Sequence, residues 1–127
     1  MKKAIGALAL TAVAMNTMAA EFTKAEICKA AIAIEMGRDV KTMKATASGG
    51  NPEISYRRSD GDTFRYQCQV SNGTVVWRGF MNDTQDWGRW RSSYAEGDSR
   101  LTYSVSGSKL TVESTQSEPE TFTKKSF

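Results

Sequence analysis

The chain has 127 residues, a formal net charge of +3 and no histidine. Without histidine, the Ser-His-Asp and Cys-His catalytic arrangements are excluded, and the commonest ligand of zinc and copper sites is missing. No glycine-rich phosphate loop follows a strand-like segment, so nucleotide binding has no support. We therefore expect no metal, no nucleotide and no other cofactor.

The N-terminus has the pattern of an export signal. Two lysines precede an apolar run over residues 4–14, which is too short to span a bilayer. The small residues that follow predict cleavage after Ala19, with Ala20 as the alternative, and no cysteine there offers a site for a lipid anchor. We interpret the protein as periplasmic or secreted in a bacterium, with a signal peptide over 1–19 and no transmembrane segment.

The remaining residues, 20–127, predict a single small domain. Removal of Lys2 and Lys3 with the signal leaves 15 basic against 14 acidic groups, a net charge of +1. The two cysteines of the domain, Cys28 and Cys68, predict one disulfide in an oxidising compartment. A reactive thiol is the alternative, but it needs surroundings that lower its pKa, and the sequence shows none.

A helix opens the domain. Thr23 and Glu26 have the Thr-x-x-Glu spacing of a capping box. The alanine-rich segment that follows favours a helix to Met36, and Gly37 is a typical C-terminal stop. Cys28 falls on the apolar face of this helix. The disulfide is therefore expected to join the helix to the inner face of a sheet.

Glu35 is unusual because it lies in the last turn of this helix, where the helix dipole disfavours a carboxylate. One interpretation is a buried acid with a raised pKa. The other is a frayed helix end, in which Glu35 pairs with Arg38 or Lys41. We favour the second, because lone acids are seldom buried.

The clearest structural pattern is a β-hairpin over residues 64–80. Two alternating segments meet at Asn72-Gly73, a pair that favours a two-residue turn. One face of this hairpin is apolar and includes Cys68, so it is expected to face the helix.

A strand over residues 54–58 precedes the hairpin. The alternation of apolar and polar residues determines the length of the turn between this strand and the hairpin. A two-residue turn would put Tyr56 on the wrong face of the sheet. We therefore predict a longer loop that pairs Arg58 with Phe64 and holds Gly61 or a neighbour at positive φ.

The rest of the chain completes an antiparallel meander. The later segments are an extended piece over 88–92, a hairpin over 100–106 and 109–114, and an edge strand over 120–127 after Pro119. The predicted fold class is α+β, with a single N-terminal helix packed on an antiparallel meander of about six strands.

Three pairs of carboxylates could carry glycoside hydrolysis or bind Ca²⁺. All of them lie in turns beside glycine, asparagine or serine, where acids occur for backbone reasons. We therefore expect no catalytic residues. The pairs are Asp60 with Asp62, Asp83 with Asp86, and Glu96 with Asp98.

Arginine and aromatic residues gather on the outer face of the predicted sheet. The hairpin register places Arg65 opposite Phe80 and Gln67 opposite Arg78, and the preceding loop places Arg57 beside Arg65. A solvated sheet face, whose arginine stems cover apolar rings, is one interpretation. A surface that binds an anionic partner is the other. The candidate binding residues are Arg57, Arg65, Arg78, Phe80, Trp87, Arg89, Trp90 and Arg91.

These patterns narrow the class of function. We interpret the protein as a non-enzymatic binding or accessory protein of the bacterial envelope, whose partner is a protein or an anionic envelope polymer. An inhibitor of a hydrolase, such as a lysozyme or a protease, is one version. The alternative is a small carboxylate-dependent hydrolase of envelope polymers, and a structural envelope component with no specific ligand is the third class. Nucleic acid is not an expected ligand, because an exported protein meets little of it.

Overall fold

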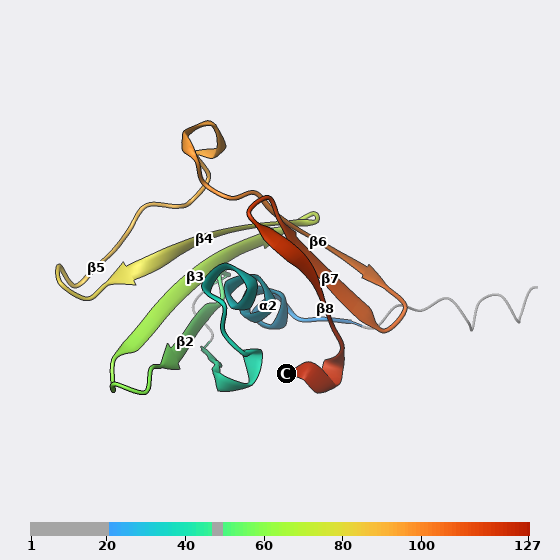
Figure 1. The fold of residues 1–127 in the computed structure, drawn as a ribbon, viewed down its shortest axis with the longest axis horizontal. Helices are drawn as coiled ribbons and strands as arrows, with labels where there is room; N and C mark the ends of the chain where they lie inside the picture. The colour runs from blue at the N-terminus through green and yellow to red at the C-terminus, as the bar shows by residue number, and fades with distance from the viewer. Residues whose placement is uncertain (1–20, 47–49) are drawn as a thin grey trace, which may run out of the picture.

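The computed structural model describes residues 21–46 and 50–127 (Figure 1). The predicted signal peptide over 1–19 lies outside this part of the chain. The described residues form one α-helix, α2 (Lys24–Met36), and three short 3-10 helices: η1 (Val40–Thr42), η2 (Tyr94–Glu96) and η3 (Lys124–Ser126). The strands are β1 (Lys44–Thr46), β2 (Glu53–Arg57), β3 (Thr63–Ser71), β4 (Thr74–Met81), β5 (Asp86–Trp87), β6 (Leu101–Ser106), β7 (Lys109–Ser114) and β8 (Ser117–Phe122).

Helix α2 has the boundaries that its sequence predicts. The Thr23 N–H donates to the Glu26 carboxylate and the Glu26 N–H donates to the Thr23 hydroxyl, which completes the capping box. Gly37 ends the helix in the left-handed conformation, with φ of 66°. Ala30 and Ala31 are fully buried. Small side chains on this helix thus allow the curled sheet to approach its backbone closely (Figure 1).

The sheet is antiparallel and has the order β1-β2-β3-β4-β6-β7-β8, with β5 paired to β4. The α+β class is confirmed, but the described residues form eight strands rather than about six. The short strands β1 and β5 account for the difference, because three and two residues carry no readable alternation.

The disulfide between Cys28 and Cys68 forms and joins α2 to β3. Both cysteines are fully buried, so the link lies inside the core. Apart from the two cysteines, the largest fully buried side chains are Ile32, Ile54, Val75, Leu101, Leu110 and Val112. The helix therefore covers the part of the inner sheet face that surrounds this covalent link.

The β3–β4 hairpin has the predicted two-residue turn, with Asn72 and Gly73 at positive φ. In the β2–β3 turn, however, Phe64 pairs with Tyr56 rather than with Arg58. Arg58 belongs to the turn itself, because its N–H donates to the Asp62 carbonyl at 2.8 Å.

This register differs from the prediction by two residues, and an even shift leaves every side chain on its expected face. Gly61 has the expected positive φ, at 97°. The shift does separate two predicted neighbours, since Arg57 pairs with Thr63 while Ser55 lies opposite Arg65. The prediction that Arg57 lies beside Arg65 is therefore wrong.

The last strand also differs from the predicted range of 120–127. Strand β8 contains Pro119, and the β7–β8 register shifts between Val112 and Ser114. Such an irregularity accommodates a residue that has no N–H to donate. After β8, η3 turns the chain so that Phe127 stacks on Phe122, with ring centres 5.8 Å apart.

Candidate functional site

Five side chains form a continuous stack on the outer face of β3, β4 and β5. We call these residues, Trp90, Arg78, Trp87, Arg65 and Phe80, the outer ladder. The Arg78 guanidinium lies 4.4 Å from the ring centre of Trp90 and 5.0 Å from that of Trp87. The Arg65 guanidinium lies 5.3 Å from Trp87 and 4.3 Å from Phe80. Each arginine therefore contacts two aromatic rings. Trp87 in turn pairs with Phe80 across β4 and β5.

The backbone after β5 follows the edge of β4 and so positions Trp90. The Gly88 N–H donates to the Gly79 carbonyl and the Arg91 N–H donates to the Trp77 carbonyl, both at 2.8 Å. A Cβ at position 88 would lie 3.3 Å from the Gly79 oxygen, so this close approach favours glycine. The predicted extended piece over 88–92 is therefore an irregular continuation of pairing that begins in β5.

The two arginines of the outer ladder differ in their hydrogen-bond partners. Arg65 Nε donates to Glu53 Oε2 at 2.8 Å, which forms an ion pair. Arg78 Nε and Nη2 both donate to Gln67 Oε1, at 2.9 Å and 2.7 Å. Gln67 is neutral, and within residues 21–46 and 50–127 Arg78 has no ion-pair partner. Arg78 is thus a positive charge held in place by neutral groups.

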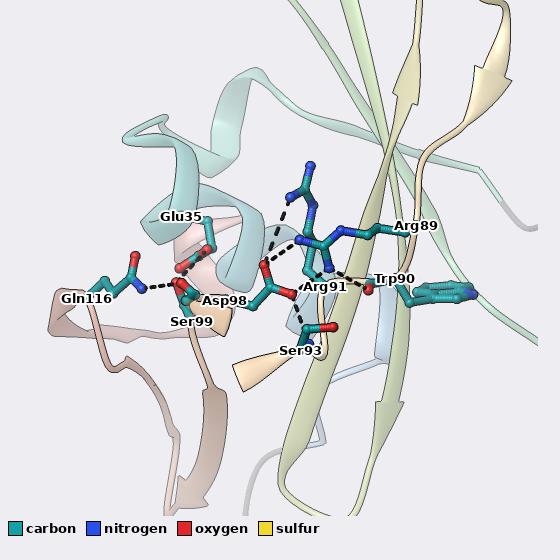
Figure 2. Close-up of polar contacts among 9 residues, drawn as sticks. Glu35, Arg89, Trp90, Arg91, Ser93, Asp98, Ser99 and Gln116 are labelled. Carbon is teal, nitrogen blue, oxygen red and sulfur yellow. Dashed lines mark hydrogen bonds and ion pairs between the residues drawn. The ribbon is translucent and has the colours of Figure 1, made fainter. Parts of the chain in front are cut away.

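A single carboxylate holds the loop between β5 and β6 (Figure 2). Asp98 accepts hydrogen bonds from Arg89 at 2.7 Å and 3.1 Å and from the Ser93 N–H at 2.9 Å, and Arg91 lies 3.9 Å away. The Asp98 side chain is only 9% exposed. The bond from Arg89 is the main cause that lowers the pKa of this carboxyl, and the Ser93 N–H lowers it further against the opposing effect of burial.

Glu35 attaches the end of this loop to the helix. The hydroxyls of Ser99 and Ser114 donate to its two carboxylate oxygens, at 3.2 Å and 3.0 Å. The favoured interpretation of a frayed end paired with Arg38 or Lys41 is therefore wrong, since no ion pair of Glu35 occurs among the described residues. The two serines lie 64 and 79 residues along the chain, too far for local sequence reasoning to find.

A second group of aromatic rings lines the inner face of β2, β3 and β4. We call Phe64, Tyr56, Tyr66 and Trp77 the inner row, and successive ring centres in it are 5.6, 6.0 and 5.7 Å apart. The two tyrosines are buried, whereas the two end members are half-buried. Three arginines lie over this row: Arg58 over Phe64 at 4.8 Å, Arg38 over Tyr56 at 5.0 Å and Arg91 over Trp77 at 5.6 Å.

The eight predicted binding residues do not form one surface. Five of them make up the outer ladder. Arg89 belongs to the Asp98 cluster, Arg91 contributes both to that cluster and to the inner row, and Arg57 lies apart at the end of β2. Sequence reasoning missed the inner row, although its members alternate in phase with Cys68, because that whole face was assigned to the helix.

Three of the six carboxylates considered for hydrolysis form ion pairs within the chain. Asp60 forms an ion pair with Arg58, and Asp62 lies 3.7 Å from the same guanidinium. Asp98 is held as described above. Among the described residues, no group of three or more side chains is suited to hold a metal ion, and no helix is long and apolar enough to cross a membrane.

Comparison of the chain with protein-family models, with curated proteins and with solved structures found no match in any of the three.

Proposed function

We propose that the protein is an exported, non-enzymatic binding protein of the bacterial envelope, and that the outer ladder binds an anionic ligand. The ligand is an acidic protein surface or an anionic envelope polymer, and both present carboxylate or similar groups to arginine. The buried Cys28–Cys68 disulfide supports an oxidising compartment. Inhibition of a hydrolase through an acidic loop of that enzyme is a more specific version of the same proposal.

The observation that carries the proposal is the setting of Arg78. Its guanidinium contacts two tryptophan rings, and its only side-chain hydrogen-bond partner among the described residues is the neutral amide of Gln67. A ladder with a purely structural role could neutralise its charge internally, as Glu53 does for Arg65. The unneutralised guanidinium is free to pair with an external anion.

The stacking also prepares Arg78 for binding. A free arginine side chain loses rotamer entropy when it is immobilised at an interface, at a cost of about 0.5–1.5 kcal/mol. Here the rings and the amide already hold the guanidinium in one orientation. Its remaining N–H groups can therefore meet a carboxylate in the planar, two-bond geometry that arginine favours.

The test compares matched variants for binding to two defined anionic polymers, poly-L-glutamate and polygalacturonate, with neutral dextran as the reference. Dissociation constants are measured by isothermal titration calorimetry on the oxidised protein. We expect Arg78→Gln to weaken binding about tenfold, which corresponds to one lost charge-assisted hydrogen bond of about 1.4 kcal/mol. Arg78→Lys should weaken it by a similar factor, because lysine keeps the charge but loses the planar fork.

Arg57→Gln is the matched control, because it removes the same charge from the same sheet face outside the outer ladder. It should weaken binding less than about threefold, as expected for a surface charge acting at a distance. Equal losses for Arg57→Gln and Arg78→Gln, or no binding to either polymer, would overturn the proposal. The polymer that binds more tightly identifies the class of ligand.

A further inference from the structure

The inner row lies on a part of the sheet that extends beyond the helix. Helix α2 packs against β1, β2, β3, β7 and β8. Figure 1 shows β3 and β4 continuing past α2 toward β5 and the β2–β3 turn. The rings of Tyr56 and Tyr66 are nevertheless buried, at 7% and 9% exposure. Part of the cover of Tyr56 is supplied by the Arg38 side chain, which follows the helix.

The three arginines over the inner row come from three different elements. Arg38 follows α2, Arg58 lies in the β2–β3 turn, and Arg91 comes from the segment along the edge of β4. Arg38 and Arg58 are exposed, and 40% of the Arg91 side chain is exposed. The inner face beyond the helix therefore presents guanidinium groups to solvent above a floor of aromatic rings.

These arginines are neutralised to different degrees. Arg58 has an ion pair with Asp60, whereas Arg91 has only the Asp98 carboxylate at 3.9 Å. The Arg91 Nε atom is also buried without any hydrogen-bond acceptor, which is an unfavourable state for a charged group. Arg38 has no ion-pair partner in the described part of the chain. On this face, Arg38 is therefore without an ion pair among the described residues, and Arg91 is only weakly paired.

We propose that the inner row and its arginines form a second binding surface, whose ligand is an acidic segment of a polypeptide. Carboxylates of that segment pair with Arg38 and with Arg91. The surface uses none of the outer ladder residues, so this inference stands independently of the function proposed above.

The two ends of the inner row favour a polypeptide over an acidic polysaccharide. The rings of Phe64 and Trp77 are only half-buried, which leaves apolar surface at both ends. A polypeptide can place apolar side chains there and carboxylates between them, whereas an acidic polysaccharide has no apolar side chains.

The three tryptophans of the chain allow the two surfaces to be read separately. Trp77 belongs to the inner row, whereas Trp87 and Trp90 belong to the outer ladder. The indole N–H signals of the ¹⁵N-labelled oxidised protein are assigned with single Trp→Phe variants. They are then followed in ¹H–¹⁵N correlation spectra during titration with a synthetic peptide that contains several glutamates and two phenylalanines. The same peptide with glutamine in place of glutamate is the reference.

We expect the Trp77 indole signal to shift in a saturable manner with the glutamate peptide but not with the glutamine peptide. Arg38→Gln should raise the dissociation constant read from Trp77 about tenfold. Arg58→Gln, which removes a guanidinium already paired with Asp60, should raise it less than about threefold. Both positions are exposed, and dispersed backbone signals verify that each variant is folded; Arg38→Lys provides a second test with the charge retained.

Three outcomes would overturn this inference. In the first, Trp77 does not shift at peptide concentrations that saturate the Trp87 and Trp90 signals. In the second, Arg38→Gln and Arg58→Gln weaken the Trp77 response equally. In the third, polygalacturonate shifts Trp77 as strongly as the glutamate peptide, which would assign the surface to polysaccharides. The Trp87 and Trp90 signals report the outer ladder in the same titration, so failure of either proposal is recognised separately.

Discussion

The two faces of the β3–β4 hairpin are covered in different ways. On the inner face, apolar side chains near Cys68 pack against α2, and a buried disulfide fixes the helix in place. On the outer face, arginines stacked between aromatic rings cover the strands, and α2 contributes nothing there. Arginines lie over aromatic rings on the inner face as well, but only beside the part that α2 covers. Cation–π stacking can thus shield a sheet face while its charges remain available to solvent.

The largest expected effect is on the inner face. We expect Cys28→Ser/Cys68→Ser to lower the free energy of unfolding by about 4 kcal/mol, because the disulfide closes a loop of 40 residues in sequence. Urea denaturation followed by circular dichroism measures the change, and the reduced wild-type protein is the control. A loss below about 1 kcal/mol would show that helix packing alone holds the inner face together.

An intermediate effect is expected on the outer face from Trp87→Ala. The substitution removes the ring that contacts both Arg65 and Arg78, and we expect a loss of about 2 kcal/mol from lost burial and two cation–π contacts. Met81→Ala, at an exposed apolar residue of β4, should cost less than about 0.5 kcal/mol in the same urea assay. If the two variants lose equal stability, the stack contributes nothing specific.

The smallest expected effect is the pH dependence given by Asp98. Its folded-state pKa lies below the ordinary value of 3.8, so its stabilisation is present above that pH and is lost as pH falls through the folded pKa. As the pH falls below about 4, the melting temperature of the wild type should therefore decrease more steeply than that of Asp98→Asn.

Asp60→Asn is the matched variant for this measurement. Its carboxyl pKa is also lowered, mainly by the hydrogen bond from Arg58, but its side chain is 49% exposed. Solvent screening should make its contribution smaller than that of Asp98. Parallel melting curves for the wild type and Asp98→Asn would contradict the role of this carboxylate in holding the loop.

Much of the fold could be predicted because its signals are local. The capping box at Thr23, the turn at Asn72-Gly73 and the alternation around Cys68 each involve neighbouring residues. The predicted pairing of β2 with β3 is wrong by two residues. The hydrogen bonds that place Arg58 in the turn leave no trace in the hydrophobic pattern.

The candidate site could be predicted only in part, for the same reason. Alternation indicated that Arg65, Arg78 and Phe80 share a face, but the irregular backbone that brings Trp90 onto Arg78 has no periodic signature. The Asp98 cluster depends on an ion pair within an irregular loop, and the Glu35 contacts join segments distant in sequence. Contacts of this kind follow from the folded topology and not from local pattern.

The segment that follows the edge of β4 also bears on aggregation. Strand β4 pairs with β6 only at Thr74 and Val75, so the rest of its edge would otherwise be open to a strand of another molecule. Strand β5 and the N–H groups of Gly88 and Arg91 occupy that edge instead. Of the two outermost strands of the sheet, β1 has three residues and β8 contains Pro119 between two glutamates. The long central hairpin is thereby protected from edge-to-edge association at high protein concentration.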